Sequence, residues 1–390
     1  MQTNTDIVNI LHMTKLGAGG ISTLTVNINS LLDRSKVRFD YLVFENEKTF
    51  YEEKIEALGA RKVIVDVKRY QNKKLLLYFQ KYLQTKRMLK QNQYDVVHVD
   101  ASTPMDVVIG LAAKHAGVKV RILHSHIAGD NKHSLFRNIY LNICRKMMLT
   151  TFTDYFAISE ISARFMFPRK ISSKKNYTII KNGIVAEKYA FDLVVREQLR
   201  KELKLENNFT LGHVGRFSAE KNHLFMLDIF KIIKEKKDNA RLLLIGDGAL
   251  RHDIENKIHA LELEDSVILY GTTQDVPRLM MAMDAFVFPS RFEGLGIAAI
   301  EAQCSGLQTF CSNGIPDETN ITELFHRING YDPAIWANEI LNVAVNPRVS
   351  RVDDVKKAGF DLCKVANQLQ NFYLKGYFDG EGIDTGSTPR

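Results

Sequence analysis

The feature that most constrains this chain is a regular alternation of strand-like and helix-like stretches through its first half. Short apolar runs rich in β-branched and aromatic residues predict strands, and longer amphipathic stretches predict helices. The expected strands are 7–13, 39–44, 62–66, 96–99, 119–124, 155–158 and 177–180, with helices at 22–32, 50–58, 72–91, 105–115, 133–148 and 160–165. Such alternation indicates a parallel sheet that helices cover on both faces.

A second alternation begins after a charged stretch without a strand at 184–208. Its expected strands are 210–214, 241–245, 267–270, 285–288 and 309–311, with helices at 222–236, 250–261, 276–283 and 297–305. Because 390 residues exceed what one core usually supports, we expect an α/β protein with two Rossmann-like, doubly wound domains facing across a cleft. The expected parts are a first domain at 1–185, a connection at 186–208, a second domain at 209–360, a helix crossing back at 361–377 and a disordered tail at 378–390.

The net charge is unevenly distributed between the two halves. Lys and Arg minus Asp and Glu give +14 for residues 1–190 and −6 for residues 191–390, which sum to +8. A basic first domain suits an anionic membrane surface, and a merely solvated, lysine-rich surface is the alternative. No nucleic-acid partner is expected.

Cysteine spacing and hydropathy bear on the compartment. The four cysteines have no CxxC spacing, which suits a reducing environment without structural zinc. No apolar run approaches the ~20 residues of a membrane span, and the first residues lack the features of a signal peptide. We therefore expect a cytoplasmic protein, at most peripheral to the inner face of the membrane.

The strongest motif is the segment 288–301, where a strand ends, a glycine-containing loop follows and a helix begins near Ile297. Glu293 lies in the loop, and Glu301 lies about one turn into the helix. Backbone N–H groups of such a loop can bind phosphate, and two carboxylates can accept hydrogen bonds from vicinal diols. A surface glutamate and a helix-stabilising glutamate would have the same spacing.

Glu293 and Glu301, with seven residues between them, resemble the E-x7-E signature of glycosyltransferase family 4. The segments 182–184, 211–222, 245–248 and 270–277 are similar to further landmarks of that family, so the resemblance spans about residues 1–315. Lys181 departs from the family, which usually has proline there, and the similarity is weak after Thr319. The motifs are most similar to those of enzymes that build capsular or exopolysaccharide repeat units.

The resemblance implies a GT-B fold and a retaining transfer of sugar from a nucleotide-diphosphate sugar, UDP-linked rather than GDP- or ADP-linked. The implied acceptor is a glycan or a polyprenyl-diphosphate-linked glycan. No nucleophilic carboxylate is implied, so we expect front-face substitution, in which the leaving phosphate accepts the acceptor's proton. A GT-B nucleotide-sugar epimerase and a non-catalytic scaffold of a polysaccharide assembly are the alternatives.

The resemblance also implies a set of donor-binding residues. They are Gly19, Gly20, Arg216, Lys221, Gly246, Glu293, Gly294, Leu295, Gly296, Ile297 and Glu301. We assign Glu301 to the nucleotide ribose, Glu293 to the transferred sugar, and Arg216 with Lys221 to the diphosphate. His126, Glu293, Arg216 and Lys221 are the expected catalytic residues.

Arg216 and Lys221 have a physical case of their own. Arg216 follows a strand and Lys221 precedes a helix, so both cations can converge on the crevice beyond the sheet. A nucleotide diphosphate gains about one negative charge as the glycosidic bond breaks, and fixed cations stabilise that transition state selectively. The chain has no D-x-D pair, so we expect no metal and no other cofactor, and we expect Gly246 in a close-packed turn.

Two short motifs follow strands of the first domain. Gly17-Ala-Gly-Gly20 opens a helix, but Ser22 stands where the dinucleotide fingerprint has glycine, which weakens a nicotinamide site and leaves an anion-binding turn. His124-Ser-His126 follows the strand at 119–124, where the family resemblance implies a histidine near the donor sugar. His126 fits that role better, and His124 could be a core histidine.

The helix expected at 72–91 has two apolar faces on a helical wheel. One is a stripe that we expect to pack on the sheet: Leu75, Leu76, Phe79, Tyr82, Leu83 and Leu89. The other mixes cations with apolar groups and suits lipid headgroups: Lys74, Leu77, Lys81 and Met88, with Arg137, Arg145 and Lys146 in a similar setting. Packing of Leu77 and Met88 on a neighbouring helix is the alternative.

Overall fold

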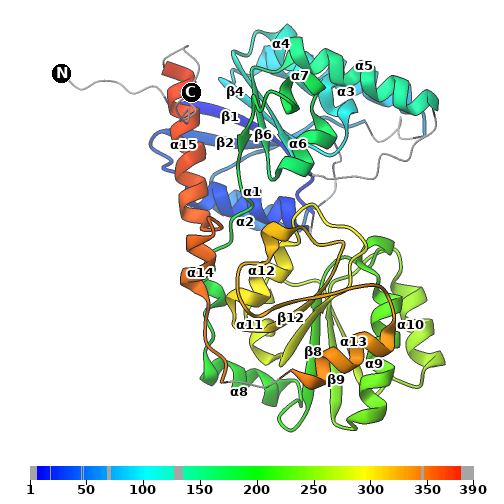
Figure 1. Cartoon of the computed structure of the whole chain (residues 1–390). Helices are drawn as coiled ribbons and strands as arrows, with labels where there is room; N and C mark the ends of the chain where they lie inside the picture. Colours follow the sequence, from blue (N-terminus) through cyan, green and yellow to red (C-terminus); the bar gives the residue numbers. More distant parts are fainter. Residues whose placement is uncertain are drawn as a thin grey trace. The chain divides into compact units, whose positions relative to one another are not determined.

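The computed structural model describes residues 7–17, 19–44, 46, 48–67, 72–126, 135–343 and 347–378. The chain divides into two compact units (Figure 1). The first is Met1–Gly183 together with Leu362–Arg390, and the second is Ile184–Asp361. In the described part of the chain, each unit is built on a parallel sheet between helices.

The sheet of the first unit has the strand order β3-β2-β1-β4-β5-β6-β7. Its strands are β1 (Val8–Met13), β2 (Val37–Val43), β3 (Lys62–Ile64), β4 (Val96–Ala101), β5 (Val120–Ser125), β6 (Asp154–Ala157) and β7 (Thr178–Ile179). Its helices are α1 (Gly20–Leu31), α2 (Glu52–Ala57), α3 (Lys74–Gln91), α4 (Val107–Ala116), α5 (Leu135–Thr151), α6 (Glu160–Met166), α7 (Arg169–Ser172) and α15 (Leu362–Phe378). The strand order reverses between β1 and β4, a switch point at which doubly wound sheets bind ligands.

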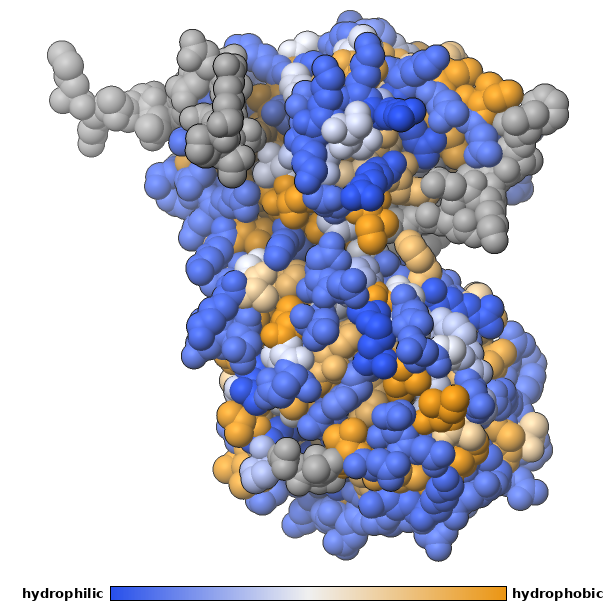
Figure 2. Space-filling model, viewed as in Figure 1, coloured by the Kyte–Doolittle hydropathy of each residue, from blue (hydrophilic) through white to orange (hydrophobic). Residues whose placement is uncertain are grey.

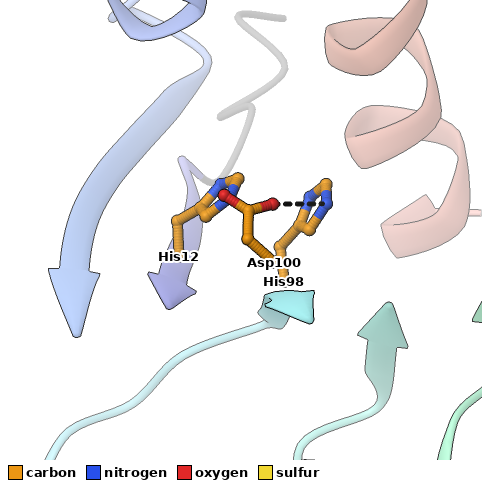
Figure 3. A group of neighbouring side chains, drawn as sticks. All are labelled: His12, His98 and Asp100. Carbon is orange, nitrogen blue, oxygen red and sulfur yellow. Dashed lines mark ion pairs between the residues drawn. The ribbon is translucent and has the colours of Figure 1, made fainter. Parts of the chain in front are cut away.

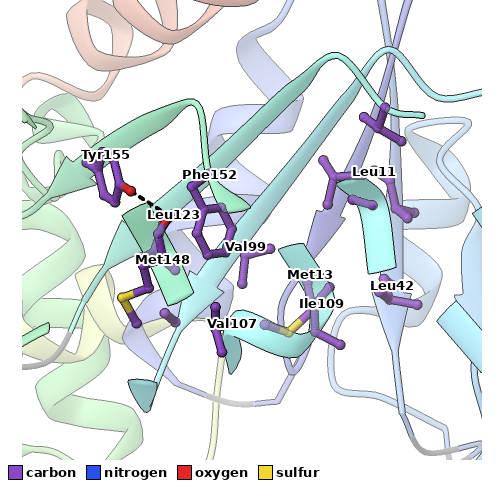
Figure 4. Close-up of a cluster of buried hydrophobic side chains, with 14 of the residues drawn as sticks. Leu11, Met13, Leu42, Val99, Val107, Ile109, Leu123, Met148, Phe152 and Tyr155 are labelled. Atoms are coloured by element: carbon purple, nitrogen blue, oxygen red, sulfur yellow. Dashed lines mark hydrogen bonds between the residues drawn. The ribbon is translucent and has the colours of Figure 1, made fainter. Parts of the chain in front are cut away.

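The two faces of this sheet differ in chemistry because successive side chains of a strand point to opposite faces. Leu11, Val99 and Leu123 belong to a hydrophobic core with residues of α4 and α5 (Figure 4). Polar residues adjacent to them in sequence, which are His12, His98, Asp100 and His124, lie on the other face, toward α1 and α15. His98 Nδ1, for example, lies 2.8 Å from the Tyr373 hydroxyl of α15.

The sheet of the second unit has the order β10-β9-β8-β11-β12-β13, with its switch point between β8 and β11. Its strands are β8 (Phe209–Val214), β9 (Ala240–Ile245), β10 (Val267–Gly271), β11 (Ala285–Phe288), β12 (Gln308–Ser312) and β13 (Phe325–Ile328). Its helices are α8 (Leu193–Glu202), α9 (His223–Lys236), α10 (Arg251–Ala260), α11 (Val276–Ala282), α12 (Ile297–Cys304), α13 (Pro333–Asn342) and α14 (Val352–Lys357). Its core includes Phe230, Leu242, Phe310 and Trp336.

The two doubly wound domains predicted from the sequence are confirmed. The stretch 186–208, expected as a connection, instead belongs to the second unit and contains α8. Arg196 and Arg200 of α8 both pair with Asp284, Arg200 at 3.1 Å, which fastens this helix to the residue before β11. The last helix groups with the first unit and ends at Phe378, the first residue of the tail expected at 378–390, while residues 379–390 lie outside the described residues.

The predicted packing of α3 is wrong. Leu75 and Phe79, expected on the sheet, are 75% and 55% exposed, whereas Leu77 and Met88 pack against the core. Leu89 is buried as expected. The side chains of Lys74 and Arg137 lie outside what the structure describes.

The surface of the first unit is mostly hydrophilic, but apolar groups reach it near α5 (Figure 2). Ile139 and Ile143 of α5 are among the exposed large apolar side chains. None of the helices in the described ranges has an apolar stretch long enough to span a bilayer.

Candidate functional site

The loop after β8 carries the two cations expected to bind a diphosphate. Arg216 is exposed near its start, and Lys221 is half-buried near its end, just before α9. Asn222 follows in the left-handed conformation, with φ of 61°, which asparagine adopts more readily than most residues. The Asn222 side-chain amide donates to the Pro289 carbonyl at 3.3 Å, so this loop is fastened to the loop after β11.

The loop after β11 carries Glu293 and the motif glycines. Its Gly296 has φ of 81°, a conformation natural to glycine, and directly precedes α12. Gly294 lies half-buried before it, and Ile297 is the first residue of α12. The Leu295 side chain, expected to bind the donor, is buried in the protein.

An ion pair joins the two loops. Lys221 Nζ lies 2.6 Å from Glu293 Oε1, and the two side chains are only 19% and 12% exposed. The Lys221 ammonium also lies 5.0 Å from the centre of the Phe288 ring, within reach of a cation–π contact. The residue expected at the diphosphate and the residue expected at the sugar therefore meet, since β8 and β11 are neighbours in the sheet.

Glu301 of α12 accepts a hydrogen bond from the Tyr189 hydroxyl at 2.5 Å. Burial raises the pKa of the Glu301 carboxyl to about 7, although the bond from Tyr189 lowers it. This carboxyl therefore changes charge near neutral pH. Sequence reasoning missed Tyr189, because its contact depends on the short helix Ala186–Tyr189 packing against α12 in the fold.

Gly246 forms the close-packed turn that the sequence predicts. Its φ is 143°, and a Cβ at this position would lie 2.0 Å from the Gly215 carbonyl oxygen. Asp247 is engaged within the same turn: it accepts from Gly248 N–H at 2.7 Å and lies 3.3 Å from Arg251 Nη1. The loop after β8 can approach β9 only because position 246 lacks a side chain.

The glycine motif of the first unit begins α1 as expected. Gly19 is its N-cap with an extended backbone, and Gly20 is its first residue. Thr23 Oγ1 donates to the Gly19 carbonyl at 3.1 Å. Ala18, in the middle of the motif, lies outside the described residues.

Five polar side chains are buried beside the switch point of the first unit, on the face toward α1 and α15. They are His12 of β1, His98 and Asp100 of β4, His124 of β5, and His126 just after β5. Figure 3 shows His12, His98 and Asp100 pointing toward one another from the two neighbouring strands. The register of the sheet explains the cluster, because it pairs His12 with His98 and Asp100 with His124.

The Asp100 carboxylate is the centre of this cluster. Its Oδ1 lies 3.0 Å from His126 Nε2, and its Oδ2 lies 2.8 Å from His12 Nε2. Burial raises the pKa of Asp100, but the adjacent His12 and His126 side chains outweigh burial and hold it well below its ordinary value. The carboxylate is therefore ionised at neutral pH.

The remaining histidines of the cluster pair with each other. His98 Nε2 lies 3.1 Å from His124 Nδ1, and burial lowers the pKa of both rings well below the ordinary value. Two overlapping sets, His12–His98–Asp100 and Asp100–His124–His126, have ligand atoms within 4.8 Å of one another and are of a type that binds transition metals. Hydrogen bonds between donors and acceptors also account for the contacts of His98, His124 and His126.

Sequence reasoning found only part of this cluster. It selected His126 and treated His124 as a core histidine, and it missed His12, His98 and Asp100. The available signal was polar residues inside otherwise apolar strands, spaced by two so that they share a face, as in His98-Val-Asp100.

Two family models match the chain, one in each half. "Glycosyltransferase Family 4" matches residues 18–188, and "Glycosyl transferases group 1" matches residues 195–331. The boundary between the two matches lies close to the boundary between the two compact units.

Three bacterial proteins are similar to most of the chain. EpsF of Bacillus subtilis (strain 168) is 29% identical over 379 residues, 95% of this chain and 97% of that protein. The UDP-Gal:alpha-D-GlcNAc-diphosphoundecaprenol alpha-1,3-galactosyltransferase of Escherichia coli is 29% identical over 310 residues, 74% of this chain and 77% of that protein. The capsular polysaccharide biosynthesis glycosyltransferase CapH of Staphylococcus aureus is 24% identical over 379 residues, 94% of this chain and 99% of that protein.

A solved structure shares the fold. HepE of Anabaena, in complex with UDP and glucose, superposes with a TM-score of 0.73 at 18% identity and covers 93% of this chain and 98% of its own. With matches to both family models and two doubly wound domains of the GT-B type, the chain belongs to glycosyltransferase family 4.

Proposed function

We propose that this glycosyltransferase moves a sugar, with retention at the anomeric carbon, from a UDP-sugar to a lipid-linked glycan in bacterial surface polysaccharide synthesis. The observation that carries the proposal is the Lys221–Glu293 pair at the switch point of the second unit. It places a cation suited to a diphosphate beside a carboxylate suited to sugar hydroxyls. The names of the E. coli and S. aureus relatives and the UDP bound to HepE support the donor, the acceptor and the pathway type.

The residues of the second unit would share the donor between them. Lys221 and Arg216 would bind the diphosphate, Glu293 the transferred sugar, and Glu301 the ribose hydroxyls. As the bond from the anomeric carbon to the diphosphate oxygen breaks, the acceptor oxygen bonds to that carbon on the same face. The acceptor's proton passes to the leaving phosphate oxygen, and the two cations stabilise the charge that develops there.

The first test is a thermal-shift panel of UDP-, GDP- and ADP-sugars. A ligand at ~100 times its dissociation constant stabilises the protein by about 2.7 kcal/mol. UDP-sugars should raise the melting temperature of the wild type and of Lys257→Ala, which breaks a 2.7 Å ion pair with Asp228 away from these loops. Lys221→Ala should lose the shift, and an equal response in both variants would remove Lys221 from the donor site.

The second test is the stereochemistry and metal dependence of transfer to synthetic sugar-diphosphate-lipid acceptors. NMR coupling constants should report a product with the donor's anomeric configuration. The reaction should also survive EDTA, because in this proposal Lys221 and Arg216 take the place of a metal ion at the diphosphate. An inverted product, or activity lost in EDTA and restored by Mg²⁺, contradicts the mechanism. Solvent deuterium appearing in the sugar without transfer would indicate an epimerase.

We also propose that the first unit docks on an anionic membrane through α3 and α5. Within their bounds these helices carry eight Lys or Arg residues and no Asp or Glu, with five cations in α3 and three in α5. Leu75, Phe79, Ile139 and Ile143 are exposed on them. Cations beside exposed apolar groups suit a headgroup region, to which each cation contributes about 1 kcal/mol.

Liposome co-sedimentation tests this docking. Binding should require anionic lipid, fall with added salt, and weaken in Leu75→Ser/Phe79→Ser and in Arg87→Glu/Lys90→Glu, whose side chains are exposed. Lys81 is less suitable for substitution, because its ammonium lies 4.2 Å from the centre of the Phe44 ring and its loss would also remove that contact. The matched control is Leu193→Ser/Val194→Ser, an exposed apolar pair on α8 of the other unit. Equal binding by all variants would refute docking through α3 and α5.

A further inference from the structure

Three elements meet at the Asp100 carboxylate. Besides His126 on Oδ1 and His12 on Oδ2, the Thr25 hydroxyl of α1 donates to Oδ2 at 3.1 Å. Asp100 is 6% exposed, and His126 is 7% exposed. A buried carboxylate with partners on both oxygens has a fixed orientation, so it can in turn fix the rings that contact it.

The contact with Asp100 determines which nitrogen of His126 carries the proton. An ionised carboxylate only accepts hydrogen bonds, so His126 Nε2, at 3.0 Å from Oδ1, must be the N–H donor. In the neutral ring Nδ1 then holds a lone pair. That Nδ1 is buried and has no hydrogen-bond partner among the described residues.

The other histidines do not compete for the same role. His98 Nε2 and His124 Nδ1 are each 3.9 Å from Asp100 Oδ1, beyond hydrogen-bond distance, and are 3.1 Å from each other. His12 is within 2.8 Å of Oδ2 but is not aligned for a hydrogen bond. Among the described histidines of the cluster, His126 therefore has the one aligned hydrogen bond to Asp100.

We propose that Asp100 is a positioning residue that holds His126 as the Nε2–H tautomer, so that Nδ1 accepts a hydrogen bond from a hydroxyl of the bound sugar. This tautomer discriminates between ligand groups. A hydroxyl has a proton to give, whereas a phosphate or carbonyl oxygen would face the Nδ1 lone pair without one. The inference rests on the proposed function for the identity of the hydroxyl. The tautomer of His126 follows from its contact with Asp100 and does not depend on the proposed function.

The tautomer can be measured without any substrate. Nitrogen-15 NMR of the histidine rings, with the His126 signal assigned by comparison with His126→Gln, should show a bare Nδ1 and a protonated Nε2 at pH 7.5. Asp100→Asn should mix the two tautomers, since an amide can present either a donor or an acceptor. Asp100→Leu, which has the same branched shape but no polar atoms, should remove the preference altogether. A protonated Nδ1 in the wild type, or an unchanged tautomer in both variants, overturns the proposal.

Kinetics with UDP-glucose or another active UDP-sugar test the consequence. Loss of a group that orients a metal-binding histidine typically lowers activity about 10–100-fold, and by analogy we expect kcat/KM of Asp100→Asn to fall in this range. Monodeoxy donors should identify one hydroxyl whose removal costs the wild type more than it costs Asp100→Asn. If every monodeoxy donor slows both enzymes equally, His126 does not accept from the sugar.

A matched control is Asp40→Asn, which removes another fully buried carboxylate from the same sheet. Asp40 pairs with Arg61 at 2.6 Å and accepts from Tyr94 at 2.9 Å, on the β2 side of the sheet. It should lower the melting temperature without altering the His126 signals. Absence of any transfer activity in the wild type would contradict the proposed function, while the NMR result would still decide the role of Asp100.

Discussion

Donor affinity should rise steeply with pH around neutrality, because Glu301 has to be ionised to accept hydrogen bonds from both ribose hydroxyls. With its pKa raised to about 7 by burial, the carboxyl is ionised in about 9% of molecules at pH 6 and about 91% at pH 8. The apparent dissociation constant scales inversely with the fraction of molecules in which Glu301 is ionised, so it should fall about tenfold over this interval.

The stability of the protein without donor should change in the opposite direction. Between about pH 4.5 and 7, Glu301 of the folded protein keeps a proton that the unfolded chain has lost. The free energy of unfolding therefore falls as pH rises.

Isothermal titration calorimetry with UDP-glucose at pH 6, 7 and 8 measures the effect. UDP-glucose is preferable to UDP, whose terminal phosphate itself titrates near pH 6. Glu301→Gln should bind weakly and with little pH dependence. Tyr189→Phe removes the bond that lowers the pKa of Glu301, so its transition should move to higher pH. A wild-type affinity that is flat, or that weakens toward pH 8, would refute the reasoning.

Three further predictions concern the loops of the second unit. Lys221→Ala should cost about 2–4 kcal/mol of transition-state stabilisation, measured from kcat/KM, and wild-type turnover would contradict the assignment. Glu293→Gln releases Lys221 from its 2.6 Å ion pair, so calorimetry should show UDP binding at least as tightly as in the wild type while sugar transfer slows; weaker UDP binding would show that the pair organises the loop. Gly246→Ala should lower the melting temperature more than Gly59→Ala, because both have positive φ but only the Cβ at 246 meets a backbone oxygen, at 2.0 Å.

The sequence was sufficient to predict the succession of strands and helices along the chain, but not the shortest strands. β9 and β11 could be predicted because nearly continuous apolar runs are typical of strands buried on both faces. β13 was not predicted, because it is a four-residue strand, Phe325–Ile328, with two half-buried polar residues in the middle. It exists because it pairs with β12, a long-range contact that the local pattern does not encode.

Helix α3 shows a second limit of local pattern. A helical wheel identifies its apolar faces but not which of them meets a neighbour. The face containing Leu77 and Met88 is packed because α3 lies against α4, while Leu75 and Phe79 remain exposed. The alternative packing considered for Leu77 and Met88 is the one that the fold contains.

The candidate site was predictable where it depends on topology and unpredictable where it depends on register. Lys221 and Glu293 follow strands that become neighbours in any doubly wound sheet of this order, so their meeting follows from the strand assignment. Asp100 reaches His126 only because β4 and β5 pair with Asp100 opposite His124. A shift of one residue would turn Asp100 toward the apolar face, and no feature of either strand alone fixes that register.

Each switch point thus carries a carboxylate that already has side-chain partners before any ligand arrives. In the second unit the partner is Lys221, in a salt bridge between two loops, and an incoming diphosphate can compete for Lys221 because that pair is only partly buried. In the first unit Asp100 contacts β1, α1 and the end of β5, and in our proposal a ligand hydroxyl contacts His126 rather than the carboxylate itself. The exchangeable pair therefore suits binding and release of a charged group, whereas the enclosed one suits holding a neutral hydroxyl in a fixed direction.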